Sequence, residues 1–358
     1  MSRSRRVTRL ARGQVFWGSL GVVVMASMAA GSVILFHRAI DAPPSQTSSA
    51  FPASTATLTE AASSVSVDSC NSPVQVVAAP VSGVEVTARV QWGPSYDPNG
   101  IWSLSGGELT VGDPTCSDNY QLISVRLVVP LKTNVTVDSG GGSVSVTGTP
   151  GAYIDSGNGP VAATDIHGPL NVTTGGGSLS VQGLTGSLNA DTGNGPLNAT
   201  DIDGPVTAST DGGSLGVFNL TGKLDADTGN GPLNAVDIDG PITASTDGGS
   251  LNVRDLTGTL SANTGNGPLS ATGVSASSVN AITDGGAARL QFVTVPSMVV
   301  VSTDNGPAAL MMPGGPYAVT ANAGGGPSSV TVPTDPSAHQ TITVTTDGGS
   351  LTVQPTAQ

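Results

Sequence analysis

The sequence has little of what most enzymes need. Only 3% of its 358 residues are aromatic and 10% are charged, and it has two cysteines and three histidines. No zinc-protease motif, phosphate-binding loop or dinucleotide-binding glycine motif occurs in a suitable context. His37, His167 and His339 have no cysteine or serine partner at the spacing of a nucleophilic triad. We therefore expect no enzyme, no catalytic residue and no cofactor.

Basic residues are also scarce beyond the N-terminus. From Asp41 onward the chain has six basic residues against 25 acidic ones, a net charge of −19. Such a surface repels polyanions, which argues against nucleic acid or anionic lipid as its partner. It is compatible with solubility outside a cell, or with cations.

One long uncharged stretch exists, from Val15 to Phe36. It is long enough to cross a bilayer as a helix, and the five arginines in residues 1–14 predict that the N-terminus stays inside. The alternative is a cleaved signal peptide, since small residues surround Ala29. The apolar run continues beyond Ala29, which favours a retained signal anchor. Residues 37–64, rich in Pro, Ser, Thr and Ala, predict a linker.

A glycine-rich repeat of 18 residues makes up the centre of the chain. The anchor glycines of this repeat are Gly159, Gly177, Gly195, Gly213, Gly231, Gly249 and Gly267. A fixed period of this size indicates a solenoid. Within each unit apolar residues alternate with polar ones, which predicts strands, and Asn-Gly or Gly-Gly pairs predict the turns.

The repeat therefore predicts an all-β fold: a parallel, right-handed β-solenoid of about twelve coils of ~18 residues, roughly 55–60 Å long. An antiparallel meander of hairpins is the alternative, because Asn-Gly is also a hairpin turn. The strict period favours the solenoid. Regular repeats are expected over 138–273, with wider coils and a C-terminal cap over 274–358.

Stacked coils should align equivalent side chains about 4.8 Å apart. A hydroxyl residue precedes each turn, so we expect a surface ladder in which each threonine hydrogen-bonds its copy in the next coil. The members of this ladder are Thr174, Thr192, Thr210, Thr228, Thr246 and Thr264.

Residues 65–137 are less regular and predict an N-terminal cap with the first irregular coils. They contain both cysteines, and Cys70 and Cys116 are expected to form a disulfide in an exported chain. It would stabilise the fold by roughly 4 kcal/mol in the chain-entropy model. Aromatic residues such as Trp92 and Trp102 are expected in the core of the cap, or alternatively form a ligand platform.

Aspartates are the best chemical candidates. Asp165, Asp201 and Asp237 recur every 36 residues, and Asp203 and Asp239 follow two of them. Carboxylates in turns can bind Ca²⁺. Aspartate is also simply a good turn residue, and 22 of the 25 acidic residues are aspartates. We therefore expect no metal site, with calcium at these five residues as the weaker alternative.

The order of several motifs carries a family resemblance. They are the opening VDSC and VQVV, SLSGGELTVGDPTC, LISVRLVVPLKTNVTVDSGGGSVSV, repeated TGNGPL and TDGGSL, and the close ITVTTDGGSLTV. Together they resemble a bacterial family of β-solenoid repeat domains described as adhesins, whose function is unknown, over Val65 to Gln358. The resemblance implies a solenoid outside a bacterial cytoplasmic membrane, tethered by one helix. It implies no catalytic residues.

The sequence leaves two kinds of function. The first is an adhesin that binds envelope glycans or surface proteins through repeated Thr, Ser, Asn and Asp side chains. The second is a structural or signalling scaffold of the cell envelope, bound to a membrane partner or to itself. In either case we expect a single-pass membrane protein with most of its chain outside the cytoplasm.

Overall fold

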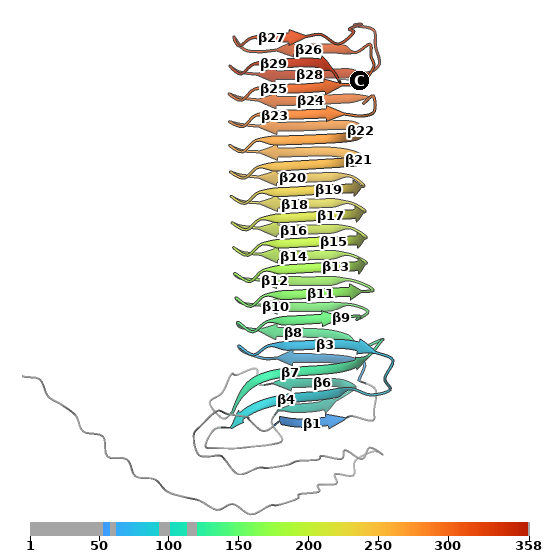
Figure 1. Ribbon diagram of the computed structural model, residues 1–358, viewed down its shortest axis with the longest axis vertical. Coiled ribbons are helices and arrows are strands. Elements are labelled where there is room, and N and C mark those ends of the chain that lie inside the picture. The colour runs from blue at the N-terminus through green and yellow to red at the C-terminus, as the bar shows by residue number, and fades with distance from the viewer. Residues whose placement is uncertain (1–52, 58–61, 93–100, 113–119, 357–358) are drawn as a thin grey trace, which may run out of the picture.

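The chain folds into a rod of stacked β-strands (Figure 1). The computed structural model describes residues 53–57, 62–92, 101–112 and 120–356, which contain 29 strands and no helix. About ten turns of the rod keep the ~18-residue period. Each coil gives one strand to each of two sheets, and equivalent strands pair in parallel. This pairing confirms a β-solenoid and excludes the hairpin meander for the repeats.

The first sheet, called face A, contains the first strand of each regular coil. Its strands are β8 (Asn134–Ser139), β10 (Ala152–Ser156), β12 (Leu170–Thr174), β14 (Leu188–Thr192), β16 (Val206–Thr210), β18 (Leu224–Thr228) and β20 (Ile242–Thr246). The opposite sheet, called face B, contains the second strand of each coil. Its strands are β9 (Val144–Thr147), β11 (Val161–Ile166), β13 (Leu179–Thr185), β15 (Leu197–Asp203), β17 (Leu215–Thr221) and β19 (Leu233–Asp239).

Toward the C-terminus the coils widen. Two long strands, β21 (Leu251–Thr264) and β22 (Leu269–Thr283), run without a break from face B round to face A. They are followed by β23 (Ala288–Phe292) on face B, β24 (Met298–Thr303) on face A and β25 (Ala308–Met312) on face B.

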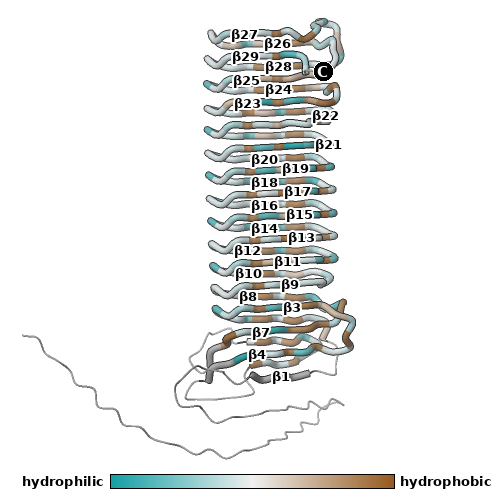
Figure 2. Tube along the Cα trace, viewed as in Figure 1, coloured by the Kyte–Doolittle hydropathy of each residue, from teal (hydrophilic) through white to brown (hydrophobic). Residues whose placement is uncertain are grey.

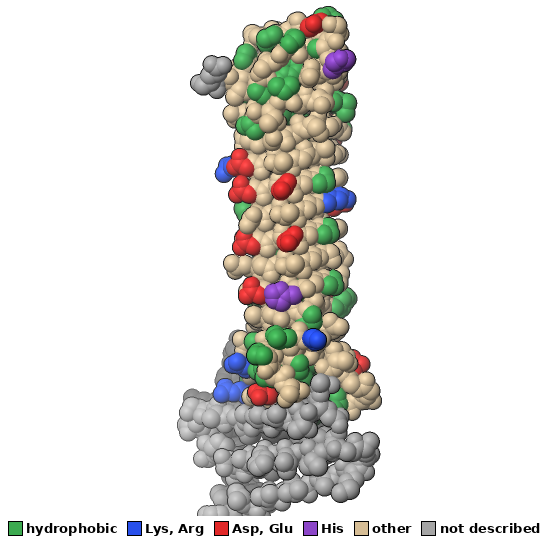
Figure 3. Space-filling model, turned by 90° about the vertical axis from the view of Figure 1, so that its right-hand side faces the viewer, with side chains coloured by type: hydrophobic (Ala, Val, Ile, Leu, Met, Phe, Trp, Pro, Cys, Tyr) green, Lys and Arg blue, Asp and Glu red, His purple; other side chains and the backbone are tan. Residues whose placement is uncertain are grey.

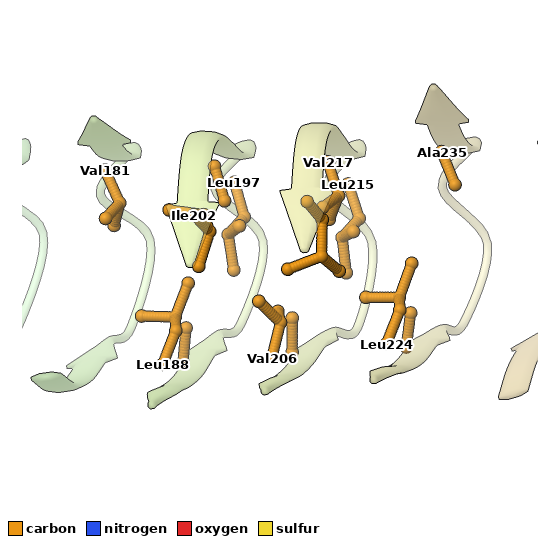
Figure 4. Close-up of a cluster of buried hydrophobic side chains, with 14 of the residues drawn as sticks. Val181, Leu188, Leu197, Ile202, Val206, Leu215, Val217, Leu224 and Ala235 are labelled. Atoms are coloured by element: carbon orange, nitrogen blue, oxygen red, sulfur yellow. The ribbon is translucent and has the colours of Figure 1, made fainter. Parts of the chain in front are cut away.

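The core is a narrow layer of aliphatic side chains between the two faces. Leu188 and Leu224 point inward from face A toward Val181, Val217 and Ala235 of face B (Figure 4), and all five are at most 1% exposed. Valine and alanine alternate along the face B column, so large and small residues can interlock at close packing. Figure 2 shows the resulting brown and pale alternation along each strand. The period-two pattern of the sequence therefore fixes which side of each strand faces inward.

The turns that follow the face A strands form the glycine edge of the rod. Here the coils approach so closely that a Cβ on Gly195 would lie 1.9 Å from the carbonyl oxygen of Gly177. Only glycine fits at this position without a backbone shift. Close approach, and not a left-handed backbone, is thus the reason for the anchor glycine of the repeat.

Two kinds of turn alternate along the glycine edge, which gives a repeat of two coils. One kind carries asparagine, such as Asn194, and the next carries aspartate and glycine, such as Asp211 and Gly212. A Cβ on Gly212 would lie 3.0 Å from the Oδ1 of Asn194, so the glycine makes room for the asparagine of the preceding coil. The 36-residue spacing in the sequence therefore has a packing cause.

The threonine ladder lies inside the rod, so its predicted place on the surface is wrong. The six side chains are 0–3% exposed. Each Oγ1 donates a hydrogen bond of 2.7–2.9 Å to the carbonyl of the glycine three residues later in its own turn. The hydroxyls do not bond to their copies in the next coil. The residues concerned are Thr174, Thr192, Thr210, Thr228, Thr246 and Thr264.

Both ends of the rod are out of sequence order. At the N-terminal end, β2 (Ser64–Asp68) lies between β6 (Glu108–Gly112) and β8, while β3 (Val74–Ala79) lies between β7 (Tyr120–Pro130) and β9. At the C-terminal end, β28 (Thr341–Thr346) lies between β24 and β26 (Ala318–Asn322), while β29 (Leu351–Pro355) lies between β25 and β27 (Ser328–Val330). At the N-terminal end the outermost parallel strands, β6 and β7, come later in the chain than β2 and β3 beneath them. At the C-terminal end the outermost strands, β26 and β27, come earlier in the chain than β28 and β29 beneath them.

The N-terminal end is closed by antiparallel strands. β4 (Glu85–Trp92) pairs antiparallel with β7, and β1 (Ala53–Thr57) pairs antiparallel with β4. On the other face β5 (Trp102–Ser105) forms an antiparallel pair with β6. Half-buried Trp102 packs against the core. These strands stop the parallel stacking at this end, as a solenoid cap must.

Several predictions fall on residues that the structure does not describe. The expected anchor Val15–Phe36, most of the linker 37–64 and Cys116 lie outside the described ranges, so the membrane span and the disulfide with Cys70 stay predictions. Within the described ranges, no helix has the length and apolar character needed to cross a membrane.

Candidate functional site: the outward columns and the base of the rod

The outward side chains of face A form two polar columns. Adjacent members are register partners on neighbouring strands, so they lie about 4.8 Å apart. The first column consists of Tyr153, Asn171, Asn189, Thr207, Asp225, Thr243 and Ser261. The second consists of Asp155, Thr173, Asp191, Ser209, Asp227, Ser245 and Asn263. They are exposed or half-buried, so face A offers repeated hydrogen-bonding groups.

From Asp155 to Ser245 carboxylates and uncharged groups alternate in the second column, although Asp155 is itself in register with Asp138 of β8. Asp191 and Asp227 are separated by Ser209, which places the two carboxylates two coils, about 9.6 Å, apart. Like charges directly opposite each other on neighbouring strands are destabilising. Ser245 instead donates a hydrogen bond of 2.7 Å to the Oδ1 of Asp227. The chemical unit of this column therefore repeats every two coils.

The first column carries one aromatic ring near the N-terminal end of face A. Tyr153 is 49% exposed and lies next to Thr136 of β8. Further along this column Asp225 pairs with Lys223 at 3.2 Å, and both side chains are about half exposed. An ion pair of this kind contributes little to stability. The ion pair also does not interrupt the outward polar groups of the first column.

The C-terminal ends of the face B strands form the aspartate edge, seen face-on in Figure 3. Asp165, Asp201 and Asp237 have φ of 53°, 57° and 57°, the left-handed region. Equivalent positions in the coils between carry Gly183 and Asn219 with φ of 68° and 54°. Aspartate, asparagine and glycine are the residues that tolerate this conformation. The backbone therefore explains these aspartates without a ligand.

Aspartates of different coils are also too far apart to share a cation. Asp203 and Asp239 alternate with Thr221 in one column, so they lie two coils, about 9.6 Å, apart. Ca²⁺ needs its oxygens at about 2.3–2.6 Å. In the part of the chain that the structure describes, no three His, Cys, Asp or Glu side chains come together as a metal site. Asp201 instead accepts a hydrogen bond of 2.6 Å from the Nδ2 of Asn219.

Face B differs from face A in charge. In the first four positions of β11, β13, β15, β17 and β19 the outward residues are Ala162, Thr164, Ser180, Gln182, Asn198, Thr200, Gly216, Phe218, Asn234 and Val236, none of them acidic. The acidic residues of these strands lie at their C-terminal ends, on the aspartate edge: Asp165, Asp201, Asp203, Asp237 and Asp239. Further along, the Nδ2 of Asn252 donates to the Oδ1 of Asn234 across neighbouring coils at 3.1 Å. The middle of face B is therefore neutral, whereas face A is acidic.

A hollow with a volume of about 400 Å³ lies at the N-terminal base of face B. It is lined by residues of β3, β4, β7 and β9, among them Arg89 and Arg126. Sequence reasoning missed this site, because the two arginines are 37 residues apart with no motif around them. The antiparallel register of β4 and β7 brings them together.

In comparisons with known proteins, no family model, no curated protein and no solved structure matches the chain. The resemblance to the adhesin family is supported only at the level of a β-solenoid repeat fold.

Proposed function

We propose that this chain is an extracytoplasmic, membrane-anchored β-solenoid that binds repetitive glycans of the cell envelope or of another cell surface through face A. The anchor and the location rest on the sequence, through the uncharged run Val15–Phe36 and its basic flank. The partner class rests on the two columns of face A.

The in-register repetition of face A is the observation that carries the proposal. Hydroxyl, amide and carboxylate groups recur along a straight line, with carboxylates every two coils, at about 9.6 Å. Sugar hydroxyls are hydrogen-bond donors and acceptors, and hydrogen bonds to a charged group contribute about 1.5–3 kcal/mol each. A polymer with repeating units can make the same contact several times, so weak contacts add along its length.

Two pairs of aspartates provide a matched test. Asp191 and Asp227 lie on face A, while Asp211 and Asp247 lie on the glycine edge with the same spacing of 36 residues, and all four are exposed. The full-length chain and the two double alanine variants would be sedimented with isolated envelope, with and without a calcium chelator. We expect the face A variant to bind at least ~10-fold more weakly, from the loss of two charge-assisted hydrogen bonds. The glycine-edge variant should bind as the unchanged chain does.

Equal weakening in both variants would show a general charge effect and would contradict the proposal. Binding that is lost with the chelator would instead assign a cation to the interaction. Because both variants change only exposed side chains, their circular dichroism should match that of the unchanged chain. That measurement separates lost binding from lost folding.

A second function, a structural scaffold of the envelope, is favoured by the C-terminal end. Among the described residues, β26 and β27 are each paired on one side only, and the stretch from Pro313 to Thr334 carries no charged residue. Unpaired strand edges are templates for association with another chain. A sedimentation coefficient that rises with protein concentration, without any envelope binding, would favour this function over the first.

A further inference from the structure

The hollow at the base of face B gathers positive charge in an acidic protein. Arg89 and Arg126 are two of only six basic residues that follow Asp41, and both line this hollow. None of the described residues that line it is acidic. The remaining lining residues are Pro73, Val74, Gln75, Thr87, Ser124, Val125, Ser143 and Ser145.

Strand register places the two arginines on the same outward face. Arg89 of β4 is opposite Ser124 of β7, and Thr87 is opposite Arg126, so the guanidinium groups start from diagonal positions. Diagonal neighbours on an antiparallel pair are about 7–8 Å apart, within reach of long side chains. The register shifts directly after Arg89, and such a bulge re-aims the side chains beside it.

Neither arginine forms an ion pair with any acidic residue that the structure describes. Both side chains are exposed. The ion pair between Lys223 and Asp225 is the only one that joins two described residues. The acidic residue closest in register is Glu85, which is diagonal to Arg126 on β4 and forms no ion pair with it within 4.0 Å. Two neighbouring like charges repel each other, and an anion between them would remove that cost.

Polar groups complete the lining of the hollow. One row crosses four strands, with Thr87, Arg126, Gln75 and Ser145 as successive register partners. Hydroxyl and amide groups donate hydrogen bonds to oxygen acceptors, and guanidinium groups bind carboxylate and phosphate with two parallel bonds. Buried Val74 and Val125 are 2% exposed and form an apolar floor. Donors over an apolar floor suit an oxyanion on a larger molecule.

From this geometry we propose that the hollow binds an oxyanion, a carboxylate or phosphate group carried by an anionic polymer. The site lies on the face opposite the acidic columns, so it is separate from the surface proposed for glycan contact. The negative charge of the rod repels polyanions elsewhere, which would direct such a polymer to this one position. Arg89 and Arg126 hold the oxyanion, and Thr87, Gln75 and Ser145 lie in the row that surrounds it.

The test measures binding of the full-length chain to polyphosphate and to polygalacturonate, with neutral dextran as the control polymer. The double variant Arg89→Gln and Arg126→Gln should bind both polyanions at least ~10-fold more weakly, since each lost charge-assisted contact is equivalent to about a tenfold change in affinity. Arg254→Gln on face B is the matched control, because Arg254 is exposed, carries the same charge and lies outside the hollow. It should bind as the unchanged chain does.

Arg126→Lys sharpens the assignment. Lysine keeps the charge but loses the planar fork that matches an oxyanion, so binding should be weaker than in the unchanged chain and stronger than in Arg126→Gln. Phosphatidylglycerol vesicles form a second arm. Vesicle binding that disappears in the double glutamine variant would support the site with a lipid phosphate as its source.

Three results would overturn the proposal: no polyanion or vesicle binding by the unchanged chain at low salt, equal binding by the double glutamine variant, or equal loss in Arg254→Gln. A folding defect is excluded in parallel by thermal unfolding. Without an anion the double variant should unfold at the same or a higher temperature, because it removes a repulsion. Inorganic phosphate should raise the unfolding temperature of the unchanged chain alone. The face A aspartate variants keep this site, so its failure and that of the glycan proposal are distinguishable.

Discussion

The regular coils and the two ends of the rod are stabilised in different ways. Each regular coil repeats the same contacts with the coils on both sides, so one set of residues explains all of them. The ends have no such repetition. The N-terminal end stops with antiparallel strands, whereas the C-terminal end stops with two short strands of three and five residues that are mostly exposed. The comparison teaches that a repeat specifies how to continue, but a separate device must specify where to stop.

Glycine-to-alanine substitutions should show the largest difference in stability between the two regions. In Gly231→Ala the new Cβ would lie 1.7 Å from the carbonyl oxygen of Gly213, so two coils would have to separate. We expect a loss of about 4 kcal/mol in the free energy of unfolding. Gly348→Ala in the last turn is the matched control, because its Cβ would have no neighbour within 4 Å. Denaturant unfolding followed by circular dichroism measures both, and equal losses would contradict the close-approach explanation.

The core should show the next largest difference. Leu215→Ala removes a side chain that is 0% exposed in the middle of the rod and should cost about 2–5 kcal/mol. Val330→Ala removes a half-buried side chain in the outermost coil and should cost less than about 1 kcal/mol. Hydrogen exchange of the strand amides would locate each loss. A loss in Val330→Ala as large as that in Leu215→Ala would mean that the end coil supports the whole rod.

A smaller effect is expected from the buried hydroxyl ladder. Thr228→Val keeps the shape but removes the 2.8 Å hydrogen bond to the carbonyl of Gly231. The free energy of unfolding should fall by about 1–2 kcal/mol, because the carbonyl of Gly231 loses its hydrogen-bond donor and faces a buried methyl group instead. Thr207→Val on the exposed surface of face A should change the stability by less than about 0.5 kcal/mol. Thermal unfolding of the two variants, compared with the unchanged chain, decides whether the ladder stabilises the turns.

The smallest expected effect is a dependence on alkaline pH at the C-terminal end. Burial raises the pKa of the Tyr317 hydroxyl above its ordinary value of 10.0, and this hydroxyl donates to the carbonyl of Pro313. Because the pKa of Tyr317 is higher in the folded state than in the unfolded state, its hydroxyl contributes fully to stability below the unfolded-state pKa. This contribution is lost as the pH rises through the folded-state pKa. We therefore expect amides of β26 and β28 to exchange faster than the middle of the rod above pH 10. Tyr317→Phe should abolish that difference, and the exposed Tyr153→Phe should not.

The sequence predicted the middle of the rod better than its ends. The period-two alternation around Leu197 and Ala199 identified the inward side of the strands, and the glycine spacing identified the stacking. Both signals are local, so they can be read along the chain. The threonine ladder was misplaced, because spacing shows that Thr192 and Thr210 align but not whether their hydroxyls face solvent or their own turn.

The ends and the base hollow depend on contacts between distant segments. Nothing near Val74 indicates that this strand lies between Val125 and Val144. The same reason hides Arg89 and Arg126, since their proximity follows from the register of β4 with β7 and not from a motif. The aspartates with a left-handed backbone are an intermediate case. Turn chemistry predicted an aspartate role for Asp201 and Asp237, and the structure adds the positive φ angle that favours such a residue.

The insertion of β28 and β29 below the outermost coil has a mechanical consequence. A strand at the end of a stack can be peeled away one hydrogen bond at a time when its chain end is pulled. Here the pulled C-terminal strands have partners on both sides, and Thr356 is further tied to the carbonyl of Met312 by a bond of 2.9 Å. A load on the C-terminus therefore acts in shear on two strand interfaces at once. A rod held at one end and pulled at the other would resist unravelling from its tip.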